Sequence, residues 1–158
     1  IECDGSITIT QKRYGKEANN YYLRASFSQK DGRMVDWLLG TIGGSAYLHY
    51  RTREKKEADH HWSIQHNQAK EFLKKILPFL QMKKRQAEIG IRFQERVNVS
   101  ERKHERDERG RVLPNRIVIG EHELNERKKL FEELKAEKHQ YQFSKAPNIQ
   151  AKASTVQL

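Results

Sequence analysis

The sequence predicts an α+β domain in which two β-hairpins, joined by a helix, form a four-stranded antiparallel sheet. Residues 6–13 and 21–28 alternate apolar and polar side chains with period two, which is typical of half-buried strands. Residues 33–42 and 67–77 instead carry apolar side chains every three or four positions, which is typical of amphipathic helices. The predicted element order is ββ-α-ββ-α-α with a further C-terminal helix, so helices are expected to cover the apolar face of the sheet.

The first hairpin has one apolar and one polar face. Ile7 and Ile9 share a face of the first strand, and Leu23 and Phe27 share a face of the second. Serine, threonine, tyrosine and arginine side chains occupy the alternate positions. A polar, glycine-containing turn at residues 14–20 joins the two strands.

The second hairpin is predicted from weaker alternation. Ala46, Leu48 and Tyr50 alternate with polar residues in one strand, and Trp62 and Ile64 alternate with polar residues in the other. A charged loop is expected over residues 52–60. The assignment of faces depends on register, since a slip of one residue reverses it.

The C-terminal half is predicted to be mainly helical. Helices are expected over residues 84–97 and 121–139, from the apolar positions within each range. Residues 100–111 are densely charged with both signs, which favours a solvated loop or an exposed helix end. Residues after 140 show no period and are expected to form a loose tail.

Composition and charge narrow the choice of partner. The chain has 158 residues, of which 35% are hydrophobic and 33% charged, and its formal net charge is +10. Such an excess suits a polyanion, with nucleic acid favoured over an anionic membrane surface. No apolar run approaches the roughly 20 residues needed to span a bilayer. A single cysteine excludes an internal disulfide and favours a reducing, intracellular setting.

The first residues form an acidic cluster in a basic chain. Glu2 and Asp4 lie two positions apart, next to Gly5 and directly before the first strand. Carboxylates at the start of a DNA-facing sheet suggest a metal-binding corner. Ile1 resembles the end of an element already under way, so we expect the first helix of the fold to be truncated.

Three segments together resemble the LAGLIDADG homing endonuclease family. Residues 1–6, Ile-Glu-Cys-Asp-Gly-Ser, resemble the second half of the motif that names the family. Residues 77–87, Leu-Pro-Phe-Leu-Gln-Met-Lys-Lys-Arg-Gln-Ala, resemble its LxPFLxxKxxQA segment, and residues 27–30, Phe-Ser-Gln-Lys, match the end of its second strand. The resemblance covers residues 1–97 and, more weakly, the helix at 121–139.

The resemblance implies the LAGLIDADG-like αββαββα fold and a division of the chain. Residues 1–97 would be the endonuclease core, and residues 98–140 a charged linker and a peripheral C-terminal helix. Residues 141–158 would be the tail. Because the chain carries one motif, the resemblance implies a homodimer formed through the motif helix, which reads a roughly palindromic site in double-stranded DNA.

The resemblance also implies roles for individual residues. Asp4 would be the ligand of a divalent metal, Mg²⁺, and the carbonyl of Cys3 would also point at the metal. Lys83 would polarise the attacking water or steady the phosphate. Gln29 would position water, and Arg33 would be a supporting basic group.

The polar strand faces would contact bases and phosphates of DNA. The expected DNA-binding residues are Thr8, Thr10, Lys12, Asn20, Tyr22, Arg24, Ser26, Ser28, Tyr47, His49, Arg51, His61 and Ser63. The implied function is a homing endonuclease that makes metal-dependent double-strand breaks, encoded by a bacterium, a phage or an organelle. The alternative is a DNA- or RNA-binding module of the same fold without cleavage, such as an intron maturase or a regulator.

Plainer interpretations exist for several of these residues. Glu2 suits a supporting acid better than a ligand, and Lys83 could be a generic phosphate contact within a basic helix start. Gln29 and Arg33 could simply cap and solvate the connecting helix. The three histidines at 60, 61 and 66 have mixed spacing and no cysteine partner, which argues against zinc. Trp62 fits the core better than a base-stacking surface.

Overall fold

The computed structural model describes residues 5–14, 17–50, 58–100, 103–106, 109 and 112–144. Its main sheet has four antiparallel strands in the order β1-β2-β4-β3. These strands are β1 (Gly5–Tyr14), β2 (Glu17–Gln29), β3 (Ser45–Tyr50) and β4 (Ala58–Gln65). Helix α1 (Arg33–Ile42) joins the two hairpins, as predicted.

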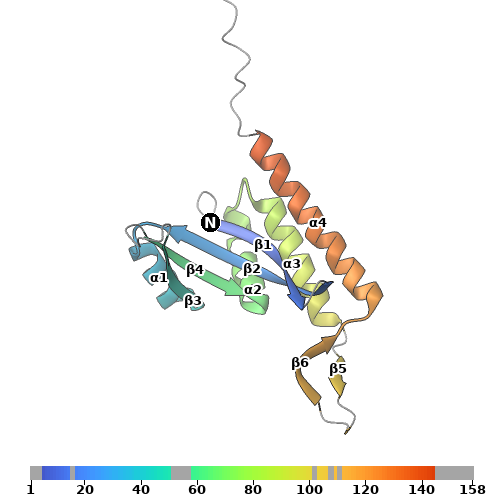
Figure 1. The fold of residues 1–158 in the computed structure, drawn as a ribbon. Helices are drawn as coiled ribbons and strands as arrows, with labels where there is room; N and C mark the ends of the chain where they lie inside the picture. Colours follow the sequence, from blue (N-terminus) through green and yellow to red (C-terminus); the bar gives the residue numbers. More distant parts are fainter. Residues whose placement is uncertain are drawn as a thin grey trace, which may run out of the picture.

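Three further helices complete the domain. Helix α2 (His66–Ile76) leads through a short 3₁₀ turn, η1 (Leu77–Phe79), to α3 (Lys84–Val99). Helix α4 (Glu121–Ser144) then runs beside α3 (Figure 1). None of the described helices combines the length and apolar character required to cross a membrane.

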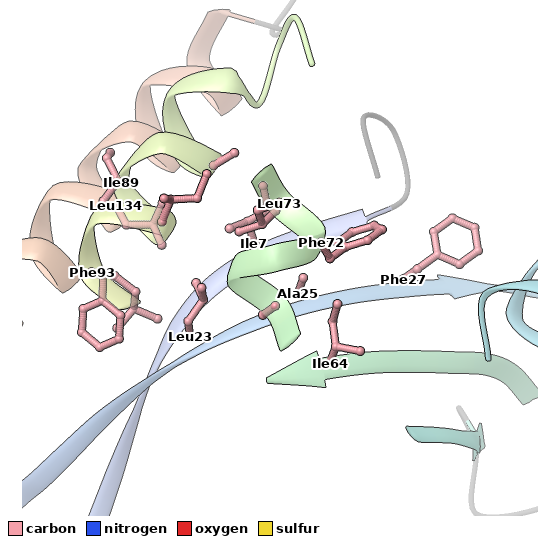
Figure 2. Close-up of a cluster of buried hydrophobic side chains, with 14 of the residues drawn as sticks. Ile7, Leu23, Ala25, Phe27, Ile64, Phe72, Leu73, Ile89, Phe93 and Leu134 are labelled. Atoms are coloured by element: carbon pink, nitrogen blue, oxygen red, sulfur yellow. The ribbon is translucent and has the colours of Figure 1, made fainter. Parts of the chain in front are cut away.

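The hydrophobic core lies between one face of the sheet and the helices. Ile7, Leu23, Ala25 and Ile64 are at most 1% exposed, and they come from three neighbouring strands. Figure 2 shows how they meet side chains from the helices, which include Phe72, Leu73, Ile89, Phe93 and Leu134. The period-two alternation is therefore confirmed over residues 7–9 and 21–27, where every second side chain is buried in this core.

Trp62 belongs to the same core. It is fully buried, packs edge to face on Phe72 at 5.5 Å between ring centroids, and donates from Nε1 to the carbonyl of Gly43 at 2.7 Å. The interpretation of Trp62 as a core residue is confirmed. Its hydrogen bond holds the end of α1 against β4.

The edge strand β3 differs from the expectation. All six of its residues are exposed, and Leu48 and Tyr50 retain 48% and 45% of their accessible surface. The prediction that helices cover Ala46, Leu48 and Tyr50 is wrong. Alternation in the sequence shows only that two faces differ, whereas burial requires another element above that part of the sheet.

Two other expectations about loops are corrected. β4 begins at Ala58, inside the predicted loop at 52–60, and its Asp59 is 8% exposed. The charged stretch at 100–111 contains strand β5 (Lys103–Arg106), which pairs with β6 (Val112–Val118). This two-stranded hairpin projects from the domain between α3 and α4 (Figure 1). Pro114 disfavours a central strand, but a two-stranded ribbon consists only of edges, where proline is tolerated.

Candidate nucleic-acid interface

The polar face of the main sheet brings most of the predicted DNA-binding residues together. The strand register pairs Thr8 with Arg24 and Thr10 with Tyr22. It also pairs Ser26 with Ser63, and it pairs His61 with both Ser28 and Tyr47. Directly opposite residues on antiparallel strands share a face, so this face is continuous across all four strands.

Four predicted DNA-binding residues remain, and they lie in different places. Lys12 lies at the far end of β1, and His49 lies opposite Asp59 on the polar face. Asn20 is opposite Lys12, but its side chain is used inside the protein, as described below. Arg51 lies outside the described residues.

An aromatic and basic cluster lies on the polar face across β2, β4 and the edge strand β3. The rings of Tyr47 and His61 stack at 5.1 Å with an interplanar angle of 7°, and His49 meets His61 edge-on at 5.9 Å. Arg24 donates from Nη2 to the Tyr47 hydroxyl at 3.4 Å. This cluster offers a cation and several hydrogen-bonding groups on one surface, which suits contacts with phosphates and base edges.

Two nitrogen atoms of this cluster have no partner in the described part of the chain. Arg24 Nε and His61 Nδ1 are shielded from solvent and make no hydrogen bond there. Burial lowers the pKa of His61 from 6.5, and the neighbouring His49 and Arg24 lower it further, against an opposing effect of Asp59. His61 is therefore neutral near pH 7 and can present both a donor and an acceptor.

The second part of the site lies at the start of β1. Lys83 immediately precedes α3, and its side chain is 7% exposed. Its Nζ donates to the carbonyl oxygen of Gly5 at 2.5 Å. Hence the lysine that sequence reasoning selected lies beside the residue that follows the Glu-Cys-Asp segment.

Gln29 and Arg33 lie at the same end of the sheet. Gly5 is opposite Phe27, so Gln29 is two positions further along β2, and Arg33 begins α1 four residues later. Together with Met34 and Trp37 they line a shallow depression. Arg33 is engaged with Asp31, to which it donates from Nε at 2.8 Å, and this interaction lowers the pKa of Asp31 to about 2.

The residues expected to bind a metal ion lie outside the described part. Cys3 and Asp4 precede Gly5, where the described chain begins. Among the residues described, no group of three or more His, Cys, Asp or Glu side chains could hold a metal ion. A carboxylate at position 4 and a carbonyl at position 3 fit Mg²⁺ chemically, since this hard cation takes oxygen ligands and needs few of them from the protein.

Sequence reasoning missed two functional candidates on α4. Arg127 is 2% exposed and donates to Glu123 at 2.8 Å, to Asn20 at 2.9 Å and to Ser100 at 2.6 Å. Lys138 reaches back to β1, where its Nζ donates to Ser6 Oγ at 3.3 Å. Neither residue stands out in a helix rich in lysine, arginine and glutamate, because only tertiary packing distinguishes them.

Solved structures with the same fold include homing endonucleases. An archaeal intron-encoded enzyme, I-Vdi141I, solved with DNA, matches with a TM-score of 0.63 and 17% identity over 86% of this chain and 77% of that one. I-CvuI, solved with its target in the presence of calcium, matches with a TM-score of 0.61 and 12% identity over 86% and 75% of the two chains. I-CvuI with uncleaved DNA in the presence of magnesium gives 0.61 and 13% over the same shares.

Sequence comparison alone finds no relative. No protein-family model matches the chain, and no curated protein matches it either. The fold is nevertheless defined by the four-stranded sheet, the order of its helices and the structural matches. The chain has the fold of the LAGLIDADG homing endonucleases.

Proposed function

We propose that this protein is a site-specific DNA endonuclease that hydrolyses phosphodiester bonds in both strands of a duplex. The observation that supports this most strongly is the contact between Lys83 and Gly5. Lys83 is buried and holds its ammonium group against Gly5, the residue that follows Asp4 in the sequence, so the Asp4 carboxylate would lie at the same end of the sheet. Phosphodiester hydrolysis is accelerated by a metal-activated water, which a carboxylate-held ion would supply, and by a cation that stabilises charge on the phosphate.

The polar sheet face would bind the duplex. Arg24, Tyr47, His49 and His61 would contact base edges and phosphates, together with the serine and threonine side chains of β1 and β2. The net charge of +10 would attract the duplex to the protein. Structures of two homing endonucleases with the same fold contain DNA, which supports the choice of partner.

The cleaving end would be built from Asp4, Lys83, Gln29 and Arg33. Asp4 and the Cys3 carbonyl would hold Mg²⁺, which supplies an acidic bound water and neutralises charge on the phosphate. The Lys83 ammonium would stabilise negative charge that develops on the phosphate oxygens. Gln29, an uncharged amide at the same end, would orient a water molecule.

The proposed enzyme would act as a homodimer. One chain carries one Asp4 and one Lys83, whereas cutting both strands requires two reacting centres. A homodimer would supply both centres and would match a roughly palindromic site. Analytical ultracentrifugation with and without DNA tests this part separately.

The test is a selection experiment. The protein is mixed with a library of duplexes of random sequence, first without a divalent metal to recover bound sites and then with Mg²⁺ to recover cut sites. We expect the wild type to bind and cut a common sequence, and Asp4→Asn to bind the same sequence without cutting. Binding without cutting by the wild type would instead support the non-cleaving alternative, and the absence of any enriched sequence would refute both.

A further inference from the structure

Two lysines, one before α3 and one on α4, converge on adjacent residues of β1. Lys83, before α3, donates to the carbonyl of Gly5 at 2.5 Å, and Lys138, near the end of α4, donates to Ser6 Oγ at 3.3 Å. The two lysines are 55 positions apart in the sequence. Packing of α4 beside α3 therefore places a second ammonium group next to the first.

The position of Lys138 is fixed by its helix. Leu134, one turn earlier on α4, is 2% exposed and belongs to the core. Glu133 accepts from Arg85 at 3.0 Å and also from Arg92, so it ties the same turn of α4 to α3. Residues four apart lie on one face of a helix, and Lys138 therefore extends from the face that packs on the domain.

Partial burial beside a second lysine is unfavourable for the charge on Lys138. Lys138 is partly buried, and within the described chain it forms no ion pair, with Ser6 as its hydrogen-bond partner. Burial lowers the pKa of Lys138, and the charge on Lys83 lowers it further. Two like charges held together in a partly desolvated place favour the binding of an anion between or beside them.

We propose that Lys138 is a phosphate-binding residue of the cleaving end, where it and Lys83 hold one phosphodiester group of the DNA. Ser6 supports this role, because its hydroxyl oxygen accepts from Lys138 and its own proton can be donated to a phosphate oxygen. The proposal rests on the proposed function and assigns α4 a part in substrate binding. It also explains why a lysine is held against the first strand rather than extended into solvent.

The experiment uses the full chain and a duplex enriched from the random library by the wild type. Affinity is measured over a range of salt concentrations without divalent metal, and single-turnover cleavage is then measured with Mg²⁺. The variants are Lys138→Ala and Lys138→Arg. Lys135→Ala is the matched control, since Lys135 is an exposed lysine one turn earlier on the same helix.

Loss of one phosphate contact should reduce the magnitude of the slope of log K against log salt by about 1 for each bound protomer, hence by about 2 for the proposed homodimer, in Lys138→Ala. Affinity at a fixed moderate salt concentration should fall by roughly tenfold. Lys138→Arg should retain the wild-type slope, because it keeps the charge, and Lys135→Ala should match the wild type. A circular-dichroism melt checks that each variant is folded.

The outcomes separate this proposal from the proposed function. If the wild type binds and cuts, and Lys138→Ala keeps both the slope and the cleavage rate, Lys138 has no phosphate role and only this inference is overturned. If the wild type binds without cutting, the endonuclease proposal fails, while a reduced slope in Lys138→Ala still supports the phosphate contact. If the library yields no bound duplex, both proposals are overturned.

Discussion

Truncating Arg127 tests whether α4 is an integral part of the domain. The guanidinium of Arg127 joins three elements, because it donates to Glu123 on α4, Asn20 on β2 and Ser100 at the end of α3. Its side chain is 3% exposed. Removing one member of a buried charge network lowers the free energy of unfolding by about 3–5 kcal/mol when the remaining members are left without a partner.

The partners of Arg127 are not left entirely unpaired, and this lowers the expected cost. Glu123 keeps Arg96 at 3.0 Å, the Asn20 side-chain oxygen still accepts from the Tyr21 N–H at 2.7 Å, and the Ser100 hydroxyl still donates to Val97 at 3.0 Å. We therefore expect Arg127→Ala to lower the free energy of unfolding by about 2 kcal/mol. In a domain of this size that corresponds to a fall in Tm of about 4–8 °C.

Urea unfolding followed by circular dichroism measures this cost. Arg127→Lys should lose about 1 kcal/mol, since an ammonium lacks the planar fork that reaches several acceptors at once. The control is Lys128→Ala, at the adjacent exposed position, which should stay within about 0.5 kcal/mol of the wild type. If Arg127→Ala and Lys128→Ala are equally stable, the buried network does not hold α4 in place and the reasoning is refuted.

Three further predictions concern the sheet and its connections. Gly44→Ala should destabilise the domain by about 1–3 kcal/mol, because Gly44 has φ +101° and a Cβ there would lie 2.7 Å from the Ser63 carbonyl oxygen. Gly40→Ala should instead stabilise the domain by about 0.5–1 kcal/mol, because Gly40 lies in α1 and nothing is within 4 Å of the added methyl group. A thermal melt in which Gly40→Ala has a lower Tm than Gly44→Ala would contradict the structure. The pKa of His61 is lowered in the folded state, so protonation of His61 favours the unfolded chain. As the pH falls from about 7.5 through the ordinary histidine pKa, the free energy of unfolding of the wild type should therefore decrease relative to that of His61→Gln. A difference in free energy of unfolding that does not change with pH would count against the burial of His61. Arg24→Ala should weaken DNA binding by roughly tenfold and lower the magnitude of the salt slope by about 1 for each bound protomer, whereas unchanged affinity in a filter-binding assay would exclude Arg24 from the interface.

The central sheet was predictable because its pattern is local. Ile7, Ile9, Leu23 and Phe27 alternate with polar residues along two uninterrupted strands, and each is buried in the structure. The resemblance of two separate segments to one family predicted that Lys83 lies near Asp4; Asp4 is outside the described residues, and Lys83 contacts Gly5, the residue that follows Asp4. Neither inference required knowledge of how distant helices pack.

The errors arise where burial depends on distant parts of the chain. Leu48 and Tyr50 have the alternation of a half-buried strand, yet they remain 48% and 45% exposed among the described residues. Asp59 is polar and was assigned to a loop, although it is buried within β4. The charged stretch around β5 forms a strand because β6 pairs with it, and a pairing partner cannot be read from the composition of one segment.

The residues of α4 illustrate the same limit. Lys138 is one of many lysines in the sequence, and its neighbour Lys83 is 55 positions away. Asn20 was selected as a DNA contact, whereas its side-chain oxygen accepts from Arg127, so we expect Asn20 to position β2. Only the packing of α4 on α3 makes these relations visible.

Single-turnover cleavage of bound DNA by Lys83→Met tests the central claim most directly. Methionine keeps the apolar stem of the buried side chain and removes its charge, so folding should change little, while DNA affinity should fall by roughly tenfold through the lost phosphate contact and the assay is run at saturating protein. We expect the cleavage rate with Mg²⁺ to fall by roughly a hundredfold or more at saturating protein, while Lys84→Met, the exposed neighbour, cuts at the wild-type rate. Equal rates for wild type and Lys83→Met would contradict the assignment of the cleaving end to the start of β1.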